Sequence, residues 1–128
     1  MPRLTPTAAR GTVHVALALL ALLALAPGPA ARAADPGPRV IEIVARRFQF
    51  TPRDVTLKKG EPVILRLRSD DVAHGFYSKP LGIDATIEPG KDTDVPLTPS
   101  AAGKYVVICD HFCGAGHGNM KLVLVVEE

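Results

Sequence analysis

The chain has 128 residues, enough for one domain, with 15 basic and 13 acidic residues and a formal net charge of +2. Three arginines lie within the first 33 residues. Without them 12 basic residues face 13 acidic ones, and the net charge falls from +2 to −1. No basic patch with interleaved aromatic residues is left, so the composition argues against nucleic acid as a partner.

Residues 1–33 have the pattern of a secretory signal peptide. Arg3 and Arg10 precede the apolar run Val15–Ala26, and the tripeptide ARA ends the segment with small residues at the positions that signal peptidase reads. The apolar run is shorter than the roughly 20 residues that a membrane-spanning helix needs. We therefore expect export to the periplasm and cleavage after residue 33. The alternative is an uncleaved anchor, which is the only case in which we expect a membrane association.

Residues 34–38 form a Pro/Gly linker, and residues 39–128 are expected to form one domain. This domain shows short alternating apolar segments separated by turn residues, and no helical period. Pro96 predicts that its strand lies at a sheet edge. The segments that read as strands are VIEIVA, VTLKKG, VILRLR, EPGKDTDVPL, SAAGKYVVIC and KLVLVV. The pattern predicts an all-β fold, an antiparallel β-sandwich or Greek-key barrel of seven to eight strands.

The core is expected to consist of apolar side chains on the inward faces of these strands. In VILRLR the apolar positions alternate with arginines, which predicts one buried and one solvated face. The residues expected in the core are Phe48, Phe50, Val55, Leu57, Val63, Leu65 and Leu67.

The stretch CDHFCGAGHGNM lies between the last two predicted strands and concentrates sulfur and imidazole groups. Outside residues 1–33, every Cys, His and Met of the chain lies in this stretch except one histidine, His74. Because residues far apart in sequence can meet at one end of a sandwich, His74 is expected to close over this loop. Such a set of thiol, imidazole and thioether groups favours copper over magnesium or calcium.

The spacing of these residues agrees with a known arrangement. Two His, one Cys and a weak Met ligand make a mononuclear blue-copper site, and His74, Cys113, His117 and Met120 supply that set. Cys109 is then a second thiolate four residues before Cys113. Two thiolates at that spacing can bridge two copper ions.

The chain resembles the CuA domains of cytochrome c oxidase subunit II and nitrous oxide reductase. The family motif Cys-x3-Cys-x3-His-x2-Met is met by Cys109, Cys113, His117 and Met120, and the segment DVAHGF resembles the family's stretch around its first histidine ligand, here His74. The segment FQFTPRDVTLKKGEPVILRL resembles the early strands of cupredoxins. The resemblance covers nearly all of residues 39–127 and implies a cupredoxin-like fold.

The resemblance implies a centre of two copper ions that carries single electrons. Both cysteines would bridge the coppers, each of His74 and His117 would bind one, and Met120 would be a weak ligand. The family provides a backbone carbonyl at the position of His111, where Glu or Trp is usual. The implied partner is a redox protein such as a cytochrome or a terminal oxidase. The chain has no Trp and none of the transmembrane hairpin of subunit II, so we expect an electron-transfer or copper-binding protein and not a complete oxidase.

Other interpretations stay open at this stage. In an exported protein the two cysteines could form a disulfide, or two Cys and two His could hold zinc, although zinc has no use for the methionine. A mononuclear blue-copper site and a copper carrier that supplies an oxidase fit the same ligands. No third group orients Cys113 and His117 as a nucleophile and base. The acidic residues near the loop are expected to be exposed turn residues, or a small acidic rim; they are Asp70, Asp71 and Asp110.

Overall fold

The structure is a computed structural model, and it describes residues 36–128. The expected signal peptide lies outside these residues, as do the first two residues of the linker. Residues 36–38 are exposed and irregular. Within the described part of the chain, no helix is long and apolar enough to span a membrane.

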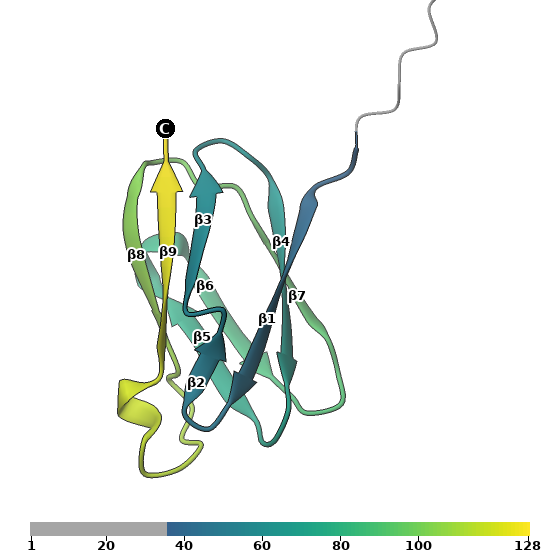
Figure 1. The fold of residues 1–128 in the computed structure, drawn as a ribbon, viewed down its shortest axis with the longest axis vertical. Coiled ribbons are helices and arrows are strands. Elements are labelled where there is room, and N and C mark those ends of the chain that lie inside the picture. Colours follow the sequence, from purple (N-terminus) through teal and green to yellow (C-terminus); the bar gives the residue numbers. More distant parts are fainter. Residues whose placement is uncertain (1–35) are drawn as a thin grey trace, which may run out of the picture. The chain divides into compact units, whose positions relative to one another are not determined.

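Residues 36–128 contain nine strands in two sheets, which confirms the expected all-β sandwich and adds one strand to the upper estimate (Figure 1). One sheet has the order β2-β1-β4-β7 and the other the order β3-β9-β8-β5-β6. The strands are β1 (Arg39–Arg46), β2 (Gln49–Thr51), β3 (Asp54–Lys58), β4 (Val63–Ser69), β5 (His74–Ser78), β6 (Ile83–Ile87), β7 (Thr93–Leu97), β8 (Gly103–Ile108) and β9 (Lys121–Glu127). Two short 3-10 helices, η1 (Lys79–Leu81) and η2 (His117–Asn119), complete the described elements.

The pairing is not purely antiparallel, and this corrects the prediction. Strand β1 pairs in parallel with β4, and β3 pairs in parallel with β9, whereas the other ladders are antiparallel. In both parallel pairs the two strands are connected through at least one strand of the other sheet, because parallel neighbours need a crossover connection. The expected edge position of Pro96 is confirmed, because β7 lies at the edge of its sheet.

The core lies between the two sheets and contains most of the residues expected there. Phe50 packs edge-on against Phe76, with ring centroids 5.4 Å apart. In β4 the three apolar positions Val63, Leu65 and Leu67 are buried, while Arg66 and Arg68 point outward and pair with acidic residues. Phe48 was expected in this core, but its side chain is 42% exposed. The Phe48 prediction is wrong because this residue belongs to the turn between β1 and β2, outside the sandwich.

Three connections meet at one end of the sandwich. They are the turn between β1 and β2, the loop between β4 and β5, and the loop between β8 and β9 (Figure 1). The last of these loops carries all the candidate ligands except His74, which directly follows the loop between β4 and β5 as the first residue of β5. The fold therefore brings His74 to the loop that holds the cysteines, as the sequence predicted.

Candidate metal centre

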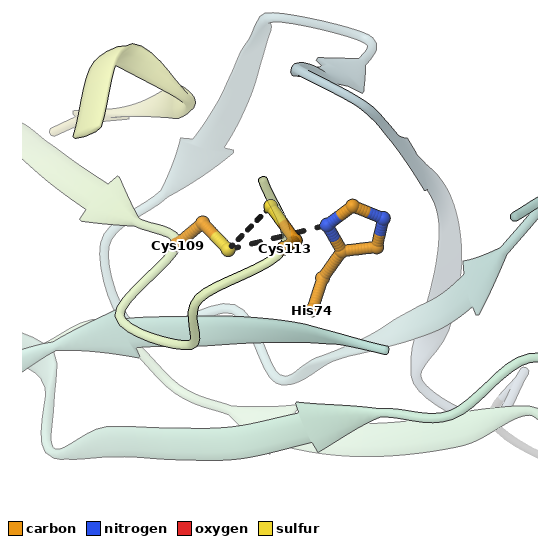
Figure 2. Close-up of side chains that lie close together, drawn as sticks. All are labelled: His74, Cys109 and Cys113. Carbon is orange, nitrogen blue, oxygen red and sulfur yellow. Dashed lines mark hydrogen bonds between the residues drawn. The ribbon is translucent and has the colours of Figure 1, made fainter. Parts of the chain in front are cut away.

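Two thiols and one imidazole converge at this end of the sandwich. Cys109 directly follows β8, Cys113 lies in the following loop, and His74 begins β5. The two Sγ atoms are 3.8 Å apart, and Nδ1 of His74 lies 4.0 Å from Sγ of Cys109 (Figure 2). All three side chains are buried, and their ligand atoms lie within 4.8 Å of one another. This spacing would let one or more metal ions be held between them.

Both cysteines are free thiols. Their sulfur separation of 3.8 Å is well beyond a disulfide bond length of about 2.05 Å. Burial, followed by the hydrogen bond with Cys109, raises the pKa of Cys113 to about 11. The raised pKa favours the protonated thiol at Cys113 in the metal-free protein, whereas a bound cation would stabilise both cysteines as thiolates.

The orientation of His74 is fixed by a residue that the sequence analysis placed in an exposed turn. Nε2 of His74 lies 2.8 Å from Oδ1 of Asp71, so its Nδ1 faces the cysteines. Asp71 is only partly exposed, and it also accepts hydrogen bonds from the backbone N–H groups of Arg47 and Val72. A carboxylate on the outer nitrogen of a ligating histidine is the usual arrangement at metal sites. The prediction of an exposed turn role is therefore wrong for Asp71, whereas Asp70 and Asp110 are exposed as expected.

Asp71 is held in its charged form. Partial burial opposes its ionisation, but the hydrogen bonds from Arg47 N–H, the His74 ring and Val72 N–H outweigh this and hold the pKa of the carboxyl well below its usual range. An ionised Asp71 can only accept a hydrogen bond, so Nε2 of His74 carries the proton. The lone pair of Nδ1 is then available on the side of the cysteines.

His117 has a polar atom that the protein leaves without a partner. Its Nδ1 is buried and has no hydrogen-bond partner among the described residues. Its ring meets that of Phe112 edge-on, with centroids 5.2 Å apart. A buried polar nitrogen without a partner is costly, and a metal ion would satisfy it. His117 does not belong to the compact cluster of His74, Cys109 and Cys113, whose ligand atoms all lie within 4.8 Å of one another.

Met120 and His111 differ in what they offer to the site. Met120 is 1% exposed and is tied to Cys109 by a 3.1 Å hydrogen bond from the cysteine N–H to the methionine carbonyl. The side chain of His111 is exposed, whereas its carbonyl accepts a hydrogen bond from the Cys109 thiol at 3.2 Å. The structure therefore turns the carbonyl of His111, and not its imidazole, toward the sulfur pair.

The donor set fits copper. It combines buried thiols, imidazole nitrogens and a buried thioether, and soft or borderline ligands of this kind are those that copper prefers. Hard cations such as magnesium and calcium would need carboxylate or carbonyl oxygens. The Cys/Cys/His cluster also fits zinc, but zinc would leave the thioether without a role.

Comparison with known proteins agrees with this geometry. The cupredoxin-like domain family matches residues 15–126. Cytochrome c oxidase subunit 2 of Thermus thermophilus is 30% identical over 102 residues, which cover 80% of this chain and 76% of that protein. Nitrous-oxide reductase of Cupriavidus necator is 29% identical over 91 residues, which cover 68% of this chain but 14% of that protein.

A solved structure supports the fold. The periplasmic domain of subunit II of cytochrome oxidase from Bradyrhizobium japonicum superposes with a TM-score of 0.65 at 16% identity, over 76% of this chain and 87% of that domain. The resemblance to the copper domains of subunit II and nitrous oxide reductase is thus confirmed. The chain belongs to the cupredoxin-like domain family, and its site supports copper as the metal.

Proposed function

We propose that this chain is an exported electron-transfer domain with a binuclear CuA-type copper centre. The observation that carries the proposal is the pair of buried thiols 3.8 Å apart, with Nδ1 of His74 facing them at 4.0 Å. Two sulfurs so close together can each contact two ions. A mononuclear blue-copper site would need only one of them.

The proposed ligands are His74, Cys109, Cys113, His117 and Met120, with the carbonyl of His111. A bound pair of copper ions would accept and release one electron at a time. The protein's contribution is to hold the ligands in one geometry. Cys109 and Met120 are tied through their backbones, and His74 is held by Asp71. The burial of the sulfur ligands limits the access of water to them.

The partner is proposed to be a redox protein, such as a cytochrome or a terminal oxidase, in the compartment outside the cytoplasmic membrane. The similarity to oxidase subunit II over most of both chains supports a respiratory partner. The signal-peptide pattern of residues 1–33 supports export. The fit of the buried sulfur and imidazole groups to copper supports a role in carrying electrons.

A copper carrier is a second candidate, and one feature favours it. An open hollow of about 380 Å³ is lined by Val72, Ala73, His111, Phe112, Cys113 and Gly114. This hollow gives a donor or acceptor of copper a route to Cys113. A carrier would release its metal to a partner through such an opening.

Retention of copper during redox cycling separates the two functions. The copper-loaded protein would be reduced and reoxidised repeatedly in the presence of a Cu(I) chelator, with the metal content measured after each cycle. An electron-transfer centre keeps its copper and its spectrum through every cycle. Loss of copper to the chelator on reduction would support the carrier and contradict the proposal.

A further inference from the structure

We propose that the turn between β1 and β2, formed by Arg47 and Phe48, positions both ligand-bearing segments of the metal centre. Neither residue is a candidate ligand. Each contacts a different part of the site, and the two are adjacent in the chain. The test by copper release and spectroscopy rests on the proposed copper site. The contacts that carry the inference, and the first test by NMR, concern the metal-free protein.

Arg47 acts on the segment that carries His74. Its backbone N–H donates a 2.8 Å hydrogen bond to Oδ2 of Asp71, and its guanidinium Nε lies 3.5 Å from the same oxygen. The other carboxylate oxygen, Oδ1, accepts from Nε2 of His74. The turn therefore fixes the carboxylate, and the carboxylate fixes the rotation of the imidazole.

Phe48 acts on the loop that carries the other ligands. Its ring lies against the backbone of Gly114 and Gly116, which are between Cys113 and His117. A Cβ placed on Gly116 would be 2.6 Å from Cδ2 of Phe48, and one placed on Gly114 would be 2.8 Å from its Cε1. Real Cβ atoms do not approach other atoms so closely, so the ring and the loop backbone determine each other's position.

The two glycines differ in a way that makes one of them a clean probe. Gly114 has a φ of +140°, so any other residue there is strained regardless of Phe48. Gly116 has a φ of −96° and a ψ of 1°, a region that residues other than glycine can adopt. The contact with Phe48 is therefore the reason for a glycine at 116. Gly118 lies in the same loop, and apart from its two chain neighbours nothing lies within 4 Å of a Cβ placed on it, which makes it the matched control.

The first test uses the metal-free protein and compares Gly116→Ala with Gly118→Ala by NMR of the histidine rings. The added methyl at 116 displaces Phe48, and the turn transmits this to Asp71. We expect Gly116→Ala to shift the ring resonances of both His117 and His74, and Gly118→Ala to leave the His74 ring unshifted. A shift of His117 alone in Gly116→Ala would overturn the proposal, because the two segments would then be uncoupled.

The second test measures the rate of copper release to a chelator and the electron paramagnetic resonance spectrum. Loss of support around metal ligands typically costs ~10-fold or more in metal affinity. We expect Gly116→Ala and Phe48→Ala each to speed release about tenfold and to alter the spectrum. Phe48→Ala replaces a partly exposed side chain at a turn, so the variant is expected to fold.

The double variant Gly116→Ala/Phe48→Ala decides whether the contact is responsible. Removing the ring makes room for the added methyl, so release should be no faster than in Phe48→Ala alone. The proposal would be overturned if the double variant released copper at a rate equal to the product of the two single effects. It would also be overturned if Gly116→Ala released copper no faster than Gly118→Ala. If the wild-type protein bound one metal ion instead of two coppers, the proposed function would fail, whereas the NMR comparison would still test the turn.

Discussion

Nε2 of His74 lies 2.8 Å from Oδ1 of Asp71, and this contact decides which ring nitrogen faces the cysteines. The carboxylate also accepts from two backbone N–H groups, so it cannot rotate freely. Nδ1 of His74 is thereby presented toward Cys109 without a metal having to organise it. A ligand set prepared in this way needs little rearrangement when its metal is bound.

Replacing Asp71 with alanine is expected to weaken copper binding by about 10- to 100-fold without removing it, because His74 loses the acceptor that fixes its ring. Chelator competition measures the affinity. The matched control is Asp70→Ala, since Asp70 is exposed and precedes Asp71 directly. Equal affinities for the two variants would show that Asp71 does not support the site.

Replacing Cys109 with serine is expected to abolish the binuclear centre, because a hydroxyl does not bridge two copper ions as a thiolate does. Metal analysis should give at most one copper per chain. The electron paramagnetic resonance spectrum should show four lines in place of seven. Two coppers per chain with an unaltered spectrum would remove Cys109 from the bridging ligands.

Replacing Met120 with leucine is expected to leave copper bound and to change the reduction potential. Leucine has a similar volume, so the packing at this buried position costs less than about 1.5 kcal/mol, and only the weak sulfur ligand is lost. Voltammetry measures the potential, and thermal unfolding of the metal-free protein checks the packing. A potential equal to that of the wild type would argue that Met120 is a core residue alone.

Replacing His111 with alanine is expected to change neither the copper content nor the spectrum. The imidazole is exposed and only the backbone carbonyl faces the sulfur pair. Alanine keeps that carbonyl. Loss of copper, or a new spectrum, would assign a ligand role to the His111 side chain.

The sequence predicted strands well where one face of a strand is buried and the other is solvated. In β4, apolar residues and arginines alternate, and the buried positions follow that alternation. Strand β5 escaped prediction because four of its five residues are buried, so HGFYS shows no alternation. The parallel pairs β1–β4 and β3–β9 depend on crossings between sheets, which local patterns do not record.

In the metal site, too, local sequence patterns predicted some features, whereas others depend on contacts between distant segments. The ligands stand out in the sequence because sulfur and imidazole residues are rare elsewhere in the chain. The supporting residues do not, because their roles depend on contacts between distant segments. Asp71 is 24 positions from Arg47, its partner in the turn, and Phe48 meets a loop near the other end of the chain. An aspartate in a turn and a phenylalanine beside a strand have common structural explanations, so nothing local marked them.

The most direct test of the central claim is the number of copper ions per chain, measured together with the electron paramagnetic resonance spectrum of copper-loaded protein comprising residues 34–128. We predict two coppers and a seven-line pattern, because one unpaired electron would be shared equally between two copper nuclei. One copper with a four-line pattern would contradict the binuclear centre and leave Cys109 as a spare thiol.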